Sequence, residues 1–142
     1  MRVLVTGAAG FVGAATTHQL LNRGDAVVGI DNLNAYYDPK LKTDRIERLS
    51  SEDRFEFIQM DCADRDRMAN LFQNGNFNTV VHLAAQAGVR YSLEHPFAYI
   101  EANLNGFLTV LEGCRQHGIE HLVYASSSSV YGNNQNLPFS VA

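Results

Sequence analysis

The sequence predicts an α/β fold built on a doubly wound parallel sheet, and two observations support that prediction. Short apolar, β-branched runs alternate along the chain with longer amphipathic stretches, which is the pattern of strands buried on both faces and joined by covering helices. The first run leads directly into glycines at positions 7, 10 and 13, and an acidic residue closes the second run. With 142 residues, 46% of them hydrophobic, the chain has material for one core, so residues 1–142 are expected to form one domain.

Five runs have the length and composition of strands: Arg2–Thr6, Ala26–Ile30, Phe55–Gln59, Thr79–Leu83 and Leu122–Ser126. Helical patterns fall between them, at about 11–23, 63–73 and 96–117. Parallel strands end at a common edge of the sheet, and ligands bind beyond that edge in doubly wound folds. Residues 32–51 interrupt the alternation, and we expect an insertion on the ligand side with a short helix whose Leu41, Ile46 and Leu49 line one side.

The three glycines after the first strand predict a site for the pyrophosphate of a dinucleotide. Gly7 permits the tight turn, Gly10 lets the backbone approach the phosphates, and Gly13 lets the next helix pack closely on the sheet. The helix predicted at 11–23 directs its unpaired amides and the positive end of its dipole at the same place. The alternative is that the glycines only ease helix packing.

Asp31 closes the second strand, 18 residues after Gly13, where an acid accepts hydrogen bonds from the adenosine ribose hydroxyls. Its carboxylate would repel a 2′-phosphate, and the neighbouring Asn32 and Leu33 supply no compensating arginine. The expected cofactor is therefore NAD rather than NADP. The alternative for Asp31 is a turn residue without a ligand.

Residues that follow the third and fourth strands extend the predicted site. Asp61 is positioned either to accept a hydrogen bond from an adenine amino group or to cap the helix that follows. His82 is expected to pack rather than to bind a metal, and no metal site is predicted. After it, Ala84, Ala85 and Gly88 fit a wall beside the nicotinamide, and Arg90 is either a cation for a diphosphate or a solvated surface residue.

Four consecutive serines, Ser126 to Ser129, follow the fifth strand at the edge where a substrate would meet the cofactor. Because side chains alternate at the end of a strand, about two of the four hydroxyls are expected to face the crevice. The alternative is a serine-rich turn that satisfies its own backbone.

Composition and charge exclude several classes of partner from those we expect. The net charge is −4 and no basic run exceeds two residues, so neither nucleic acid nor an anionic membrane is expected. Cys62 and Cys114 have neither metal-ligand spacing nor a disulfide pattern, which favours buried thiols in a reducing interior. The longest apolar stretches are strand-length and no signal region opens the chain, so a cytoplasmic location is expected.

The glycine triplet, Asp31, the Leu-Ala-Ala turn at 83–85 and the Ser-Ser-Ser-Ser-Val-Tyr-Gly run at 126–132 resemble the extended short-chain dehydrogenase/reductase family, in particular its nucleotide-sugar epimerases and dehydratases. Segments 31–42 and 85–92 are most similar to UDP-glucuronate 4-epimerases. The resemblance covers the whole chain. It implies a Rossmann fold, a tightly held NAD, a UDP-sugar substrate and a homodimeric parent enzyme. It also implies that a hydride leaves C4 of the sugar and returns to the other face of a 4-keto intermediate.

The same resemblance implies roles for individual residues. Ser127 stands four residues before the tyrosine of Val-Tyr-Gly, where the family's serine or threonine assists proton transfer at the 4-hydroxyl. Ser128, Arg90 and Asn103 are the implied substrate contacts, with Asn103 facing the nicotinamide pocket. The implied cofactor contacts are Gly7, Gly10, Phe11, Val12, Gly13, Asp31, Asn32, Asp61, Cys62, Leu83, Ala84, Ala85, Arg90 and Ser126.

Chemistry separates the epimerases from the dehydratases of this family. Loss of the C6 hydroxyl needs an acid and a base, and the dehydratases carry Asp-Glu directly after the position of Ser127. This chain has Ser128 and Ser129 there, which favours epimerisation. A dehydratase fragment and a non-catalytic dinucleotide-binding module remain the alternatives.

The family's catalytic Tyr-x-x-x-Lys motif lies well beyond the serine run, past Ala142. The one such spacing in this chain, Tyr36 to Lys40, follows the second strand and contains Pro39, which disfavours a helix there. We therefore expect a nucleotide-binding domain truncated after about the fifth strand, without its substrate domain. It should bind NAD weakly and turn over no sugar. Apolar helix surface near Phe97 to Leu111, where family dimers pack, should stay uncovered and cause self-association.

Overall fold

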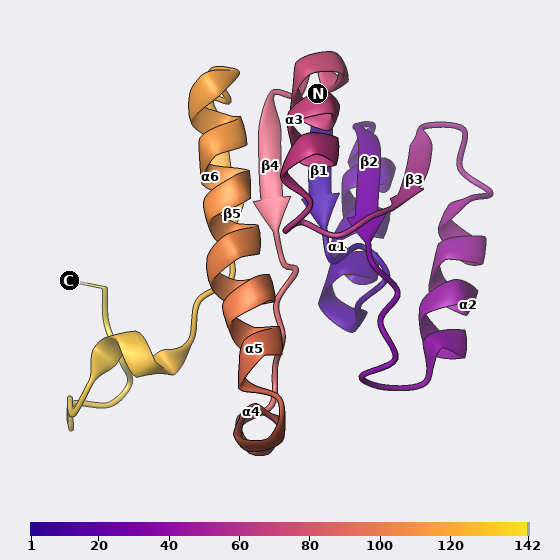
Figure 1. Cartoon of the computed structure of the whole chain (residues 1–142). Coiled ribbons are helices and arrows are strands. Elements are labelled where there is room, and N and C mark those ends of the chain that lie inside the picture. Colours follow the sequence, from indigo (N-terminus) through magenta and orange to yellow (C-terminus); the bar gives the residue numbers. More distant parts are fainter. Residues whose placement is uncertain (142) are drawn as a thin grey trace.

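The computed structural model describes residues 1–141 and contains a five-stranded, wholly parallel sheet in the order β3-β2-β1-β4-β5 (Figure 1). The strands are β1 (Arg2–Thr6), β2 (Ala26–Asp31), β3 (Phe55–Gln59), β4 (Thr79–His82) and β5 (His121–Tyr124). The strand order reverses between β1 and β4, so the loops that follow these two strands diverge and open a crevice at the carboxyl edge. The predicted doubly wound α/β fold is confirmed.

Helices cover both faces of the sheet. They are α1 (Phe11–Arg23), α2 (Pro39–Leu49), α3 (Arg65–Gly75), α4 (Val89–Glu94), α5 (Pro96–Tyr99), the π-helical η1 (Ile100–Asn105), α6 (Gly106–Gln116) and the 3₁₀-helical η2 (Ser128–Tyr131). In Figure 1, α3 and α6 lie in front of the sheet and α1 lies behind it, while the segment after β5 runs away from the sheet.

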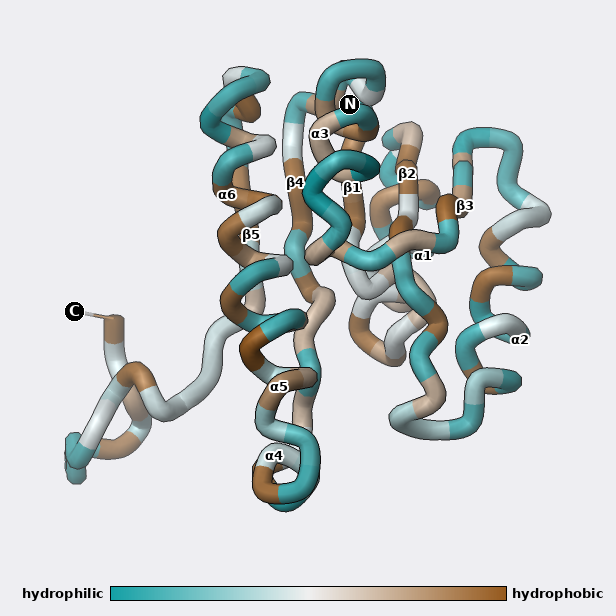
Figure 2. Tube along the Cα trace, viewed as in Figure 1, coloured by the Kyte–Doolittle hydropathy of each residue, from teal (hydrophilic) through white to brown (hydrophobic). Residues whose placement is uncertain are grey.

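Each face of the sheet has its own apolar cluster. On one face Leu4 of β1 packs with Met68 and Phe72 of α3 and Val110 of α6. On the other face Val3 and Val5 of β1 pack with Leu21 of α1 and Leu49 of α2. Successive β1 side chains thus point to opposite faces, and those from Val3 to Thr6 are buried, which explains why the strand is apolar without alternation. Figure 2 shows the resulting apolar colouring of the central strands.

Several boundaries differ from the sequence prediction. β4 ends at His82, and beyond it the N–H groups of Leu83 and Ala84 both bond to the Thr6 hydroxyl, at 3.2 and 3.1 Å. β5 ends at Tyr124, so Ser126 lies beyond the strand. The helix predicted at 63–73 begins at Arg65, because the Asp64 carboxylate caps it by accepting from the Arg67 N–H at 3.1 Å. The helix predicted at 96–117 is three consecutive segments, α5, η1 and α6.

The insertion contains the predicted helix, but its orientation differs from the prediction. Leu41 is 49% exposed, whereas Lys42 is 5% exposed. The inward side of α2 therefore runs through Lys42, Ile46 and Leu49, which are spaced as one face of a helix. Lys42 replaces the expected Leu41 because it pairs with a buried carboxylate of β2. Within residues 1–141, no helix is both long and apolar enough to cross a bilayer.

Candidate dinucleotide site

The turn between β1 and α1 has space only for glycine at two of its positions. Gly7 adopts φ +70°, and a Cβ there would lie 2.8 Å from the Ala84 nitrogen. A Cβ on Gly13 would lie 2.0 Å from the Gly7 carbonyl oxygen. The turn at Gly7 and the close packing at Gly13 are those that the sequence predicts.

The N-terminus of α1 is open to a ligand. Gly10 is the N-cap, no side chain caps the helix, and its first turn carries no acidic residue. Phe11 and Val12 of that turn are exposed. The free amides and the positive end of the helix dipole therefore suit a phosphate group, as the glycine spacing predicts.

Asp31 lies at the end of β2, buried beside the glycine turn. Its Oδ2 accepts from the Ala9 N–H at 3.2 Å, and its Oδ1 accepts from the Leu33 N–H at 2.8 Å. Its nearest cation is the Lys42 Nζ, 3.7 Å from Oδ1. The sequence neighbours of Asp31 supply no cation, as predicted, but α2 does. The sequence did not identify Lys42 as part of this site. Its burial, which is unusual for a lysine in a polar helix, is the feature that identifies it.

A cavity at the carboxyl edge gathers most of the predicted cofactor contacts. Nine of them line it: Gly7, Gly10, Asp31, Asn32, Asp61, Cys62, Leu83, Ala84 and Ala85. The sequence did not identify Tyr36, Tyr37 and Lys42 as members of this lining. Among the predicted contacts, Phe11, Val12, Gly13, Arg90 and Ser126 lie outside it.

Asp61 and Cys62 form the part of this cavity that follows β3. The Asn32 amide donates to Asp61 Oδ2 at 2.7 Å, and the Ala63 N–H donates to Oδ1 at 2.9 Å. Because Asp64 is the cap of α3, the alternative that Asp61 caps this helix is wrong. Burial raises the pKa of the Cys62 thiol to about 12, so the thiol stays protonated and unreactive at neutral pH.

A second cavity adjoins the first and shares residues 83–87 with it. Ser126 and Ser127 line it, whereas Ser128 does not belong to its described lining. Two of the four serines thus line the crevice, which is the number expected, but they are adjacent rather than alternate because β5 ends at Tyr124. The Ser127 hydroxyl also accepts from the Ser129 N–H at 3.3 Å, so part of the serine run satisfies its own backbone.

Asn103 and Arg90 differ in their relation to this second cavity. Asn103 lines it, and its side-chain amide accepts from the Gln86 N–H at 2.8 Å and donates to the Gln86 carbonyl at 3.0 Å. It thereby fixes the loop that both cavities share. Arg90 is exposed on α4 and lies outside the lining of either cavity formed by residues 1–141.

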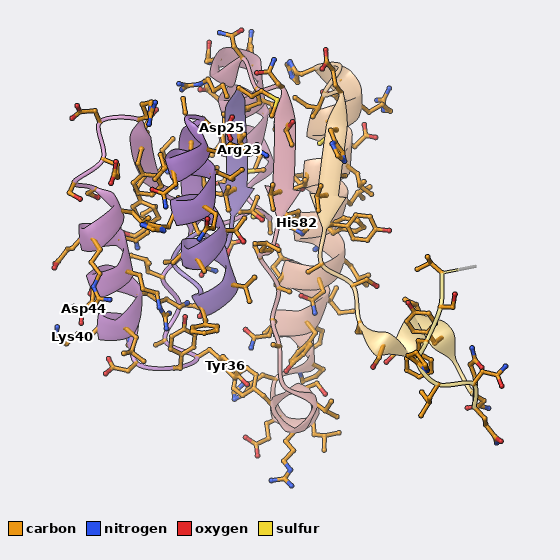
Figure 3. The ribbon with its side chains drawn as sticks, turned by 180° about the vertical axis from the view of Figure 1, so that it is seen from behind. Arg23, Asp25, Tyr36, Lys40, Asp44 and His82 are labelled. Carbon is orange, nitrogen blue, oxygen red and sulfur yellow. The ribbon has the colours of Figure 1, made fainter. Side chains whose placement is uncertain are left out.

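His82 packs at the carboxyl end of β4, as predicted (Figure 3). The Thr6 hydroxyl accepts from the N–H groups of Leu83 and Ala84 at 3.2 and 3.1 Å, so its own proton points to His82 Nδ1, 2.8 Å away. Burial lowers the pKa of His82 to about 4, so the ring is neutral with its proton on Nε2. Within residues 1–141, no cluster of three potential metal ligands exists.

Tyr36 and Lys40 do not share a helix. α2 begins at Pro39, so Tyr36 lies in the preceding loop, as the proline predicts. The Lys40 ammonium pairs instead with Asp44 at 2.7 Å, and Figure 3 shows that pair on the outer side of α2. The Tyr36 ring packs 4.9 Å from the ring of Tyr91 of α4.

Residues 4–141 match the model of the family described as GDP-mannose 4,6 dehydratase. The chain belongs to this family. The membership confirms the resemblance to nucleotide-sugar epimerases and dehydratases. Within the family, the chain is similar to an uncharacterised 37.6 kDa protein of Escherichia coli O111:H-, with 54% identity over 99% of this chain and 42% of the relative. It is 50% identical to UDP-glucuronate 4-epimerase 1 of Arabidopsis thaliana, over 97% of this chain and 32% of the relative.

A solved structure of the family has the same fold. It is UDP-glucuronic acid 4-epimerase from Bacillus cereus in complex with UDP-glucuronic acid and NAD, with a TM-score of 0.85 and 38% identity. The match covers 96% of this chain and 43% of the Bacillus cereus chain. The present chain thus spans about two fifths or less of these relatives.

Proposed function

We propose that this chain is the amino-terminal, NAD-binding part of a nucleotide-sugar 4-epimerase that acts on UDP-glucuronate. The proposal rests mainly on one observation: the glycine turn and the buried Asp31 carboxylate line the same cavity. A second cavity, lined by Ser126 and Ser127, adjoins it. Relatives at 43 to 50% identity that are named UDP-glucuronate 4-epimerases support the substrate.

In such a reaction, the residues of the two cavities would have different roles. Gly7, Gly10 and the first amides of α1 would hold the pyrophosphate, and Asp31 would hold the adenosine ribose. When bound, NAD supplies the hydride acceptor for C4 of the sugar. The Ser127 hydroxyl would hydrogen-bond the 4-hydroxyl and assist its deprotonation, and the Asn103 side chain would keep the loop at 83–87 in position.

The proposal extends to the assembly and location of the protein. Its partners are a UDP-sugar and a second copy that packs on α5, η1 and α6, and its location is the cytoplasm. Residues 1–142 form a single NAD-binding Rossmann domain within the longer enzyme, with Ser128 and Arg90 on the substrate side.

A sugar-nucleotide 4,6-dehydratase is the second candidate, because the family description itself names that activity. Ser128 and Ser129 argue against it, since elimination needs an acid and a base where this chain has two hydroxyls. A non-catalytic dinucleotide-binding module is the third. Incubation of the longer protein with UDP-glucuronate and, separately, with a nucleotide hexose that has a C6 hydroxyl separates the three. An epimerase yields the 4-epimer without loss of water, and a dehydratase removes water only from the hexose, because C6 of UDP-glucuronate is a carboxylate. A binding module yields no product from either.

The cofactor site is tested by calorimetric titration of the chain with NAD. Asp31→Ala should weaken binding about tenfold or more, since the ribose hydroxyls lose a charged acceptor. Asp44→Ala is the matched control, because Asp44 lies on the outer side of α2 and pairs with Lys40. Equal NAD affinity in the wild type and Asp31→Ala would remove Asp31 from the site, and absence of NAD binding by the wild type would contradict the proposal.

A further inference from the structure

Lys42 is an almost fully buried cation in the cavity proposed for the adenosine end of the cofactor. Its side chain is 6% exposed, and its Nζ donates to Asn34 Oδ1 at 2.8 Å and lies 4.9 Å from the centre of the Tyr37 ring. Within residues 1–141 it pairs with one carboxylate, that of Asp31, at 3.7 Å. A buried ammonium is costly without a counter-ion, so this single carboxylate balances it.

Arg45 adds a second cation one turn further along α2. Its Nη1 donates to the Ala9 carbonyl at 3.1 Å and to the Tyr37 hydroxyl at 3.0 Å. Ala9 also donates its N–H to Asp31, so Arg45 contacts the same residue of the glycine turn as the carboxylate that pairs with Lys42. Both contacts are made by one nitrogen, which leaves the other guanidinium donors for a ligand.

Lys40 shows that the burial of Lys42 is not a general property of α2. It lies two residues earlier on the same helix, its side chain is 73% exposed, and it pairs with Asp44 in the ordinary i,i+4 manner. A lysine on α2 can therefore extend into solvent, as Lys40 does, whereas Lys42 lines the cavity.

We propose that Lys42, with Arg45 beside it, is a latent binding site for the 2′-phosphate of NADP, and that the Asp31 carboxylate alone keeps the cavity selective for NAD. The inference rests on the proposed NAD site and deepens it. In the wild type, Asp31 accepts from the ribose and neutralises Lys42, so a 2′-phosphate would meet a carboxylate. Removal of that one negative charge leaves a buried ammonium whose best counter-ion is a phosphate.

The test uses Asp31→Asn, which removes the charge and keeps one oxygen, so that it can still accept from the N–H of either Ala9 or Leu33. Wild type, Asp31→Asn, and Asp31→Asn combined with Lys42→Met or with Lys40→Met are titrated with NAD and NADP by calorimetry. Asp31→Asn should bind NADP about tenfold or more tightly than the wild type does and should bind NAD more weakly. Lys42→Met should abolish the gain, and Lys40→Met should leave it intact.

Thermal unfolding with each nucleotide gives a second readout, because NADP should raise the melting temperature of Asp31→Asn more than NAD does. If the wild type binds NAD and Asp31→Asn gains no affinity for NADP, the inference is wrong and the NAD site stands. If the wild type binds neither nucleotide, the proposed function itself fails. A gain that survives Lys42→Met assigns the phosphate to other residues and overturns the role of Lys42.

If Asp31→Asn does not unfold cooperatively, and so does not fold, Asp31→Ser replaces it in the same titrations, because a serine hydroxyl also lacks the charge. Failure of both variants to fold would mean that the Asp31–Lys42 pair holds the structure together. That outcome counts against a site that is free to accept a phosphate.

Discussion

Thr6 and His82 link the central strands to the loop that both cavities share. The Thr6 hydroxyl accepts two N–H groups of the turn after β4 and gives its proton to the His82 ring. The ring stacks on Phe107 of α6 at 5.3 Å, so one imidazole contacts both the sheet and a covering helix. This network requires a neutral His82, because its Nδ1 must accept a hydrogen bond.

The neutral state of His82 predicts a specific pH dependence of stability. The unfolded state takes up a proton near pH 6.5, whereas the folded state does so near pH 4, so stability falls as the pH falls through this window. The difference corresponds to about 3 kcal/mol. His82→Asn keeps an acceptor for Thr6, and its free energy of unfolding should change less between pH 7 and pH 4.5 than that of the wild type.

Urea unfolding at several pH values measures this difference. His18→Asn is the control, because it makes the same substitution at a histidine that is exposed on α1. Parallel profiles for His82→Asn and the wild type would show that His82 is not the group that titrates.

At the scale of elements, the loops after β2 and β4 meet across the crevice through aromatic side chains. Tyr36 of the first loop packs on Tyr91 of α4, and Tyr91 in turn packs on His95 at 4.3 Å. The Tyr99 hydroxyl donates to the Ala87 carbonyl at 2.8 Å, which holds the second loop to α5. The contact between Tyr36 and Tyr91 joins the loop after β2, which lines the proposed cofactor cavity through Tyr36, to α4, which follows β4.

We therefore expect Tyr36→Ala to loosen the hold on a bound dinucleotide. Loss of one aromatic contact should make NAD dissociate about threefold to tenfold faster, as measured by stopped-flow displacement. Tyr131→Ala is the matched control, because Tyr131 stacks on Phe139 in the segment after β5. An unchanged dissociation rate for Tyr36→Ala would show that the loops do not retain the ligand.

At the scale of the whole molecule, the helices after β4 and the β5 edge of the sheet expose apolar side chains. Along α5, η1 and α6 the exposed apolar residues share one side, at spacings of three and four: Phe97, Ile100, Leu104, Leu108 and Leu111. Figure 2 shows brown segments that recur along these helices. At the β5 edge Val123 is 44% exposed. A continuous apolar stripe of this kind is typical of a surface that packs against another chain.

The stripe predicts that the chain self-associates. Multi-angle light scattering should give a mass above that of the monomer, and Leu104→Glu together with Leu108→Glu should return it toward the monomer value. Leu137→Glu is the control, since Leu137 is 76% exposed but lies in the segment after β5. A monomeric wild type across the concentration range would contradict the prediction.

Much of the fold follows from local pattern. The strand β1 is bounded as predicted, because an apolar run that ends in glycine has few other structures available to it. The predicted strand and helix ends that failed, at Leu83 and Ala63, lie beside side-chain contacts: the Thr6 hydroxyl with the N–H groups of Leu83 and Ala84, and the Asp64 cap with the Arg67 N–H. Such contacts are made by residues whose sequence patterns fit either side of the boundary.

By itself, the sequence determined the parallel sheet, the glycine turn and the acid at the end of β2, since each depends on periodicity or on spacing within one βαβ unit. Only the tertiary structure decided that Lys42 and Tyr36 line the cavity and that Arg90 lies outside it. Lys42 faces Asp31 because α2 packs beside α1 with its Lys42 side toward the end of β2, and Tyr36 meets Tyr91 because two loops 55 residues apart converge. Those relations arise from packing between elements, which no local pattern encodes.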